Sequence, residues 1–120
     1  LKWNTKITSL AAGQKMLLIF PIGSVDYANY GYVFTISPVS GVSNYTNDVN
    51  NPAINHASLH ALLGGIPALA NENSSAYDIW TTKQGFDFDI TFRDGASEYP
   101  NPYILSGIDK HILSSFKFIN

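Results

Sequence analysis

The amino-acid sequence predicts an all-β protein and, more narrowly, an antiparallel β-sandwich of the jelly-roll kind. Three observations lead to this prediction. Short runs rich in aromatic and β-branched residues alternate with polar, Asn-rich stretches. Residues 86–93 alternate strictly between apolar and polar side chains, as in a strand with one face on a core. The chain has 120 residues, enough for one core and too few for two, so residues 1–120 are expected to form a single domain.

The first half of the chain contains three predicted strands. Residues 3–9 alternate in polarity, and residues 15–20 form a short apolar run that ends before Pro21. Residues 30–37 are again rich in aromatic and β-branched side chains. Pro38 is expected to end this third strand, because proline has no N–H for the hydrogen-bond ladder.

The middle of the chain allows more than one interpretation. Residues 41–55 are polar and Asn-rich without any period, so they are expected to form a long loop, and such loops are often functional. Residues 57–66 have leucines at helical spacing, but two glycines end the pattern within about two turns. A buried strand at residues 59–63 is the competing interpretation. Residues 70–76 are expected to form a second polar loop.

The last part of the chain adds the remaining strands. Residues 77–81 are expected to form one strand, and the alternating residues 86–93 form the next. Residues 99–109 contain two prolines and a glycine and are expected to be irregular. Residues 111–119 alternate well enough to predict a closing strand.

Composition excludes several classes of function. Charged residues make up 13% of the chain, about half the usual share, and this favours an extracellular, secreted or self-assembling protein, with a homo-oligomer expected. The seven basic residues are scattered, which argues against binding of nucleic acid. No apolar run approaches the roughly 18–20 residues of a membrane-spanning helix, so membrane insertion is not expected. Because the chain has no cysteine, disulfide and thiolate chemistry are excluded.

Two catalytic patterns are present only in part. His56 and His60 have the i, i+4 spacing of a zinc site, but Ala57 stands where the usual Glu would follow. Structural or surface histidines are therefore expected. The stretch around Ser43 resembles half of a nucleophile elbow, but Tyr45 replaces its second glycine. Since no coherent set of acid, base and nucleophile emerges, the protein is not expected to be an enzyme.

Carboxylates gather around the alternating strand. Asp87 and Asp89 share its polar face, where they are interpreted mainly as a solvated surface beside Arg93, with a cation site or a glycosidase-like pair as alternatives. Asp94 and Glu98 lie further on, in a loop after the strand. Together with nearby carbonyl and amide groups, these two residues offer the oxygen ligands that calcium prefers, and sugar hydroxyls could complete its coordination.

Stretches spread over most of the chain have a family pattern: Trp3 with residues 12–14, residues 34–36 and 41–45, residues 50–52 and 59–66, and Gly85 and residues 90–92 with Asp94, Tyr99 and Asn101. In these stretches the chain resembles the calcium-dependent galactophilic lectins of bacteria of the PA-IL (LecA) type. The resemblance implies a galactose-binding-like β-sandwich, a bound calcium ion and glycans as partners.

The resemblance also implies roles for particular residues. Its metal ligands would be Tyr45, Asp94, Glu98 and Asn101, with main-chain carbonyls from the first and third. Its sugar-binding residues would be Asp94, Asn101, Tyr45 and Asn51. Pro102 stands where the family has a second Asn ligand, and Asn51 replaces the sugar-contacting His. The expected function is thus a non-catalytic, galactoside-type lectin that uses calcium. The alternative is a structural, self-assembling β-subunit of a capsid, pilus or toxin complex.

Overall fold

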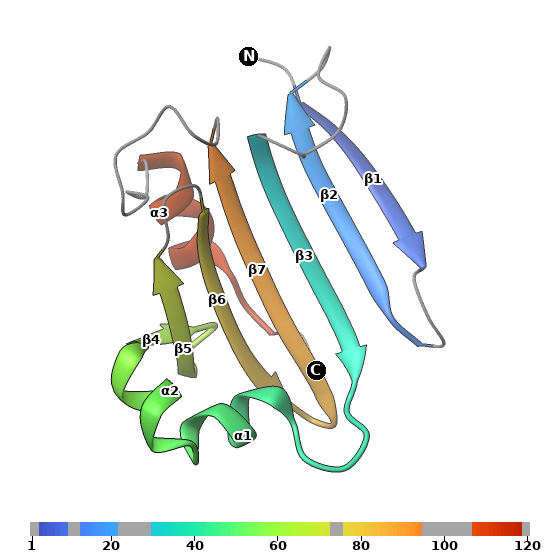
Figure 1. The fold of residues 1–120 in the computed structure, drawn as a ribbon. Coiled ribbons are helices and arrows are strands. Elements are labelled where there is room, and N and C mark those ends of the chain that lie inside the picture. The colour runs from blue at the N-terminus through green and yellow to red at the C-terminus, as the bar shows by residue number, and fades with distance from the viewer. Residues whose placement is uncertain (1–2, 10–12, 22–29, 73–75, 95–106, 119–120) are drawn as a thin grey trace.

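The structure, a computed structural model, describes residues 3–9, 13–21, 30–72, 76–94 and 107–118 (Figure 1). Its described strands form one seven-stranded antiparallel sheet, in the order β1-β2-β3-β7-β6-β5-β4. The strands are β1 (Trp3–Ser9), β2 (Lys15–Pro21), β3 (Tyr30–Pro38), β4 (Leu59–Leu63), β5 (Ile66–Glu72), β6 (Ala76–Lys83) and β7 (Phe86–Asp94). The helices are α1 (Asn44–Val49), α2 (Pro52–Ala57) and α3 (Gly107–Ser115). The prediction of a β-sheet protein is confirmed, whereas the two-sheet sandwich is not, because the described strands share one sheet.

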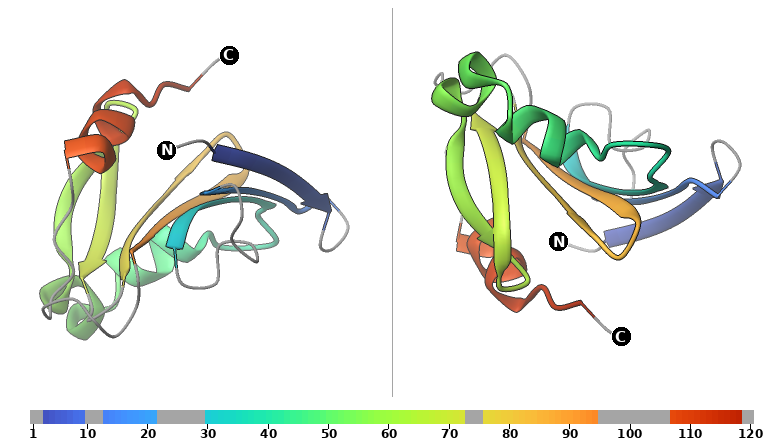
Figure 2. Two further views of the ribbon diagram at one scale, coloured as in Figure 1. Left: turned by 90° about the horizontal axis from the view of Figure 1, so that it is seen from above. Right: turned by 90° about the horizontal axis from the view of Figure 1, so that it is seen from below.

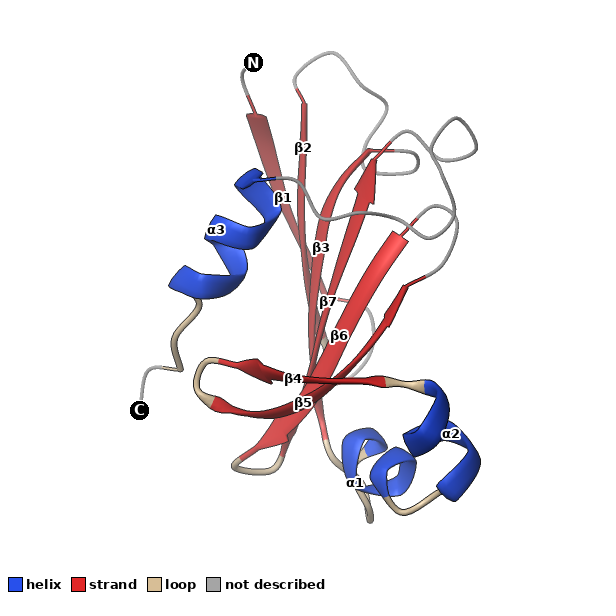
Figure 3. Cartoon of the chain, turned by 90° about the vertical axis from the view of Figure 1, so that its left-hand side faces the viewer, coloured by secondary structure: helices blue, strands red, loops and turns tan. Residues whose placement is uncertain are grey.

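The sheet bends strongly at one end. Figure 3 shows β4 and the first part of β5 running across the direction of the other strands, and Figure 2 shows β4 and β5 turned away from the plane of β1, β2 and β3. Helices α3 and α1 lie on opposite faces of the sheet (Figure 2). The molecule therefore has two distinct sheet faces, one under α3 and one beside α1.

Two hairpin turns set the register of the bent half. Gly64 and Gly65, with φ of 60° and 85°, join β4 to β5. Gln84 and Gly85, with φ of 51° and 82°, join β6 to β7. Two consecutive residues with positive φ make a turn whose twist matches that of the flanking strands. The glycine pair expected to end a helix thus joins two strands instead.

Several predictions about the local structure need correction. In the loop expected at 70–76, residues 70–72 belong to β5 and Ala76 begins β6, and α3 begins at Gly107, inside the stretch expected to be irregular. Residues 41–55 contain α1 and α2 rather than a plain loop, since Ser43 and Asn51 cap the two helices with their side-chain oxygens. Within residues 57–66, Leu59–Leu63 form the strand β4 instead of a helix, as the competing interpretation expected, but this strand is mostly exposed rather than buried. The predicted closing strand at 111–119 is wrong, because residues up to Ser115 belong to α3.

The sequence of residues 111–119 is ambiguous because its apolar residues fit both the alternation of a strand and the period of a helix. Ile112 and Phe116 fit a strand alternation, but they are also one helical turn apart. Asp109, Ile112, Leu113 and Phe116 together follow the i, i+3, i+4, i+7 pattern of an amphipathic helix. Burial of this stripe against the sheet decides the conformation, since Asp109 is buried and the three apolar residues pack at the core.

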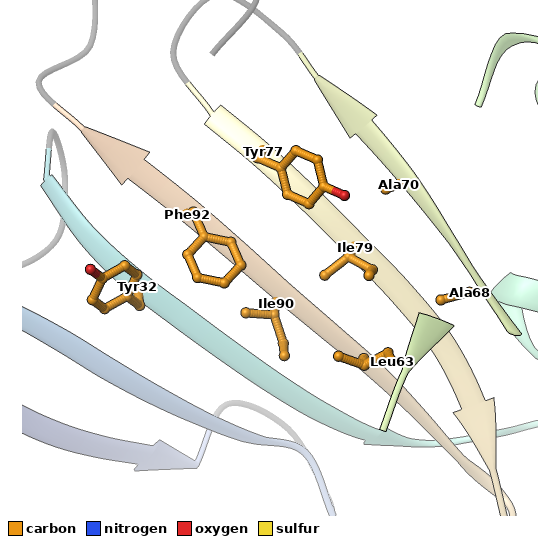
Figure 4. Close-up of a cluster of buried hydrophobic side chains, with 8 residues drawn as sticks. All are labelled: Tyr32, Leu63, Ala68, Ala70, Tyr77, Ile79, Ile90 and Phe92. Carbon is orange, nitrogen blue, oxygen red and sulfur yellow. The ribbon is translucent and has the colours of Figure 1, made fainter. Parts of the chain in front are cut away.

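The hydrophobic core lies on the face of the sheet that α3 covers, since Ile112 and Leu113 of this helix pack against it. Figure 4 shows its buried side chains on the strands. Its buried members are Tyr32, Leu63, Ala68, Ala70, Tyr77, Ile79, Ile90 and Phe92. Phe92 is fully buried and contacts Tyr32 edge to face, with ring centroids 5.3 Å apart. Each large side chain buried in this way contributes about 1.5–3 kcal/mol to folding. Ile90 and Phe92 of β7 therefore anchor the core, as the alternation predicts, whereas Phe86 at the start of the strand is exposed.

Candidate functional site

The face of the sheet opposite the core carries the polar half of β6 and β7. Because side chains alternate along a strand, Asp87 and Asp89 point away from the core that Ile90 and Phe92 enter. The register pairs Trp80 with Asp89, so Asp78 and Trp80 of β6 share this polar face with the two aspartates of β7.

Helix α1 lies over the end of this face and closes one side of a pocket. The pocket has a volume of about 300 Å³, at the lower limit of the volumes usual for small-molecule sites. It is lined by Asn44, Asp48, Asn71, Asp78, Trp80, Thr81, Asp87, Phe88 and Asp89. The lining residues come from α1, β5, β6 and β7, four elements that the fold brings together from distant parts of the chain.

One hydrogen bond caps α1, and two more join it to the sheet at the pocket. The Ser43 hydroxyl accepts from the backbone N–H of Thr46 at 3.0 Å, and this bond caps the helix. The indole Nε1–H of Trp80 donates to Asp48 Oδ2 at 3.0 Å, and the Asn44 N–H donates to Asp87 Oδ2 at 3.4 Å. These contacts fix the indole ring and bring the Asp48 carboxylate to the sheet face.

Two carboxyl groups on neighbouring strands share one hydroxyl. Thr91 Oγ1 lies 2.9 Å from Asp78 Oδ1 and 3.3 Å from Asp89 Oδ1. A threonine hydroxyl has one proton, so it can donate to only one of these oxygens at a time. Burial, followed by the hydrogen bond and the charge of Asp78, raises the pKa of Asp89 from 3.8 to about 8, although the hydrogen bond from Thr91 opposes this shift. The pair therefore retains a proton at neutral pH.

Asp87 has an incomplete set of hydrogen bonds. Its Oδ1 is buried, and no hydrogen-bond partner for this atom lies among the described residues. Its Oδ2 has the long contact with Asn44 noted above. A buried acceptor without a donor costs about 1–3 kcal/mol, so a ligand that supplies a donor here would gain that amount. The expectation of a freely solvated polar face is wrong for this half-buried group of aspartates.

The residues expected to bind sugar and calcium are only partly described. Tyr45 lies in α1, Asn51 caps α2, and Asp94 is the last residue of β7. Glu98 and Asn101 lie outside the described residues, as does the loop expected to present them.

Two of the described candidates lie at opposite ends of β7. The Asn44 N–H contacts Asp87, so Tyr45 is close to the start of this strand. Asp94 lies seven positions after Asp87, a length of about 23 Å at the usual rise of a strand. Tyr45 also lies in the first turn of α1, where a main-chain carbonyl accepts the N–H four residues ahead in the helix. The structure therefore does not bring Tyr45 and Asp94 together as ligands of one calcium ion.

Other predicted metal and catalytic patterns have structural explanations. His56 belongs to α2 and His60 to β4, so the two histidines do not share a helix face. Ser43 is buried and its hydroxyl, which also donates to Thr46 Oγ1 at 2.8 Å, serves as a helix cap. Among the residues that the structure describes, no group of three or more His, Cys, Asp or Glu is arranged to hold a metal ion.

Sequence analysis missed most of the pocket. Asp78 and Trp80 were missed because residues 77–81 were interpreted only as a strand, without a role for its polar face. The alternation of Tyr77, Ile79 and Thr81 with Asp78 and Trp80 was the available signal. Asp48 and Asn44 could not be assigned to the same site, because their approach depends on where the short helix α1 packs.

Within the described part of the chain, no helix is long and apolar enough to cross a membrane. No protein-family model, no curated protein and no solved structure matches this chain.

Proposed function

We propose that this protein is a non-catalytic carbohydrate-binding protein whose ligand lies in the pocket between α1 and the polar face of β6 and β7. The observation that carries the proposal is the composition of this pocket, which joins four carboxylates and two Asn amides around a fixed indole. Carboxylates accept hydrogen bonds from sugar hydroxyls, and amides both donate and accept. An indole offers a rigid apolar surface with little loss of side-chain entropy.

The arrangement of the carboxyl groups favours binding over hydrolysis. Glycosidases place two carboxyl groups about 5–10 Å apart, on either side of the bond that they cleave. Asp78 and Asp89, the pair that holds the proton, instead contact the same Thr91 hydroxyl and each other. A sugar linkage has no space between two groups in direct contact, so this pair is not placed to cleave one.

Calcium dependence and a galactoside specificity stay predictions from the family resemblance. They would require the loop that contains Glu98 and Asn101, whereas the proposed pocket needs no metal ion. Binding that survives a chelator therefore supports the pocket near α1, and binding abolished by a chelator supports the loop. A glycan-binding role also agrees with the secreted location that the low charge predicts.

A glycan array followed by calorimetry tests the proposal. We expect micromolar to millimolar binding of at least one glycan, and we expect Asp48→Asn and Trp80→Ala to weaken it at least about tenfold. Glu72→Gln is the matched control, since Glu72 is exposed and does not line the pocket. Binding that is unchanged in both pocket variants, or absent for every glycan, would overturn the proposal.

One observation favours the alternative function, in which the protein is a structural β-subunit that assembles into a larger complex. Strand β4 is an edge of the described sheet, carries no Lys, Arg, Asp or Glu, and exposes Leu59 and Leu62 by 44% and 66%. Unprotected apolar edges can pair with another chain. Light scattering would show large oligomers that Leu62→Lys dissociates, and a monomer at all concentrations would exclude this alternative.

A further inference from the structure

The charge of the pocket is unusually one-sided. Asp48, Asp78, Asp87 and Asp89 are four of its nine lining residues, and none of the nine is Lys, Arg or His. Lys83, the last residue of β6, has its ammonium 4.8 Å from the centroid of the Phe118 ring, and neither of these residues lines this pocket. The described lining therefore contains no cation that would balance the carboxylates.

A second observation comes from the hydrogen bonds rather than from the charge. The buried Oδ1 of Asp87 has no donor among the described residues, and its Oδ2 has only one long contact, with the Asn44 N–H. The Trp80 N–H cannot serve Asp87, because it already donates to Asp48. Asp87 thus needs a donor from outside the described chain, and a charged donor would stabilise it about twice as strongly as a neutral one.

An ammonium group would supply both the positive charge and the hydrogen-bond donor that the pocket lacks. It carries three N–H donors and no acceptor, so it can bind to several carboxylates at once. A cation is also attracted to the face of an indole ring by a cation–π interaction, and Trp80 lines the same cavity. A neutral hydroxyl could donate one hydrogen bond to Asp87 but would leave the negative charge of the pocket unbalanced.

We propose that the pocket binds the protonated amine of an amino sugar in preference to a neutral or N-acetylated one. This inference rests on the proposed carbohydrate-binding function and specifies the class of sugar. In this arrangement the ammonium contacts Asp87 and its neighbouring carboxylates, and the sugar ring lies beside Trp80. The volume of about 300 Å³ suits one small ligand, so a single charged ring would provide most of the specificity.

Two ligands of equal length that differ only at the amine provide the test. The first is a β-1,4-linked glucosamine trisaccharide, and the second is its fully N-acetylated counterpart. We expect calorimetry at pH 6.5 and low salt to show the free amine bound at least about tenfold more tightly, since hydrogen bonds to charged groups are the stronger ones. Added salt should reduce this preference, because screening weakens the attraction between opposite charges.

Two protein variants test whether the preference for the free amine depends on Asp87. Asp87→Asn keeps the shape and should reduce the affinity for the free amine much more than that for the N-acetylated sugar. Glu72→Gln, which removes an exposed carboxylate outside the pocket, should change neither affinity. Thermal unfolding of each variant shows that it is folded.

The outcomes separate this inference from the proposed function. Equal affinities for the two trisaccharides, or tighter binding of the N-acetylated one, would overturn the amino-sugar preference and leave the carbohydrate-binding function standing. Lysine amide, an amine without a sugar, is the third ligand. If it bound as tightly as the glucosamine trisaccharide, the site would recognise amines in general and the carbohydrate proposal would fail. If none of the three ligands bound, the amino-sugar preference would be overturned.

Discussion

The two faces of β7 differ in what their side chains do for stability. On one face, Ile90 and Phe92 are buried in a core that α3 covers, and their contacts stabilise the fold. On the other face, Oδ1 of Asp87 is buried without a donor among the described residues, and Asp89 lies against a second carboxyl group, so both oppose folding. Natural proteins often retain such unfavourable arrangements where a ligand needs them. The comparison therefore points to the polar face as the functional one.

The largest expected effect lies on the core face. Phe92→Ala should destabilise the protein by about 3–5 kcal/mol, because it removes a fully buried ring and leaves a cavity. Urea denaturation measures this loss, with Phe92→Leu as a milder control. A loss below about 1 kcal/mol would mean that this face is not the packed core described above.

The next largest effect has the opposite sign and lies on the polar face. Asp89→Asn should stabilise the protein at pH 8 by about 1–3 kcal/mol, since the amide imitates the protonated carboxyl group and ends the repulsion with Asp78. The same variant should weaken ligand binding. An Asp89→Asn protein that is less stable than the parent at this pH would contradict the proposed proton sharing.

The pH dependence of stability follows from the same group. The folded protein holds the Asp89 proton up to about pH 8, whereas an Asp with the ordinary pKa of 3.8 has released it well before. Because the folded state binds the extra proton, the contribution of Asp89 to stability falls as the pH rises from about 4 to about 8, and then levels off. Denaturation curves across this range should show a decline that is smaller in Asp89→Asn.

A smaller effect is expected where α1 meets the sheet. Trp80→Phe keeps an aromatic ring but removes the N–H that donates to Asp48, and it should cost about 1 kcal/mol. Hydrogen exchange of the α1 amides should accelerate, because this bond holds the helix to β6. Unchanged exchange in α1 would show that other contacts position the helix.

The smallest effect concerns the turn between β6 and β7, whose Gln84 does not line the pocket. Gln84 has a φ of 51°, a conformation that non-glycine residues rarely adopt and that Asn tolerates better. Gln84→Asn should therefore stabilise the protein by about 0.5 kcal/mol without changing ligand binding. Thermal unfolding measures the gain, and Gln84→Ala, which lacks the local hydrogen bonding of Asn, is the control.

The two faces also differ in how far sequence could predict them. The apolar alternation of 86–93 was sufficient to place Phe92 in the core, because a strand with one buried face has a definite period. The period also placed Asp87 and Asp89 on the polar face. It could not show that β6 brings Asp78 beside Asp89, since this depends on which strands pair and in which register.

Helices were the least predictable elements. The sequence S-N-Y-T after Gly41 contains the cap of α1, but one capping residue and six helical residues are a weak signal beside many polar neighbours. The position of α1 is fixed by contacts such as the bond from Trp80 to Asp48, which join residues 32 positions apart. The candidate pocket depends on that contact and was therefore not predictable from local pattern.

The central claim is that ligands bind on the polar face beside α1. The most direct test is an amide ¹H–¹⁵N NMR titration of the labelled protein with the glucosamine trisaccharide. We expect saturable shifts at the amides of Asn44, Asp48 and Asp87 and at the indole N–H of Trp80, the last assigned with Trp80→Phe. Saturable shifts confined to the Asp94 end of β7, or no saturable shifts, would contradict the claim.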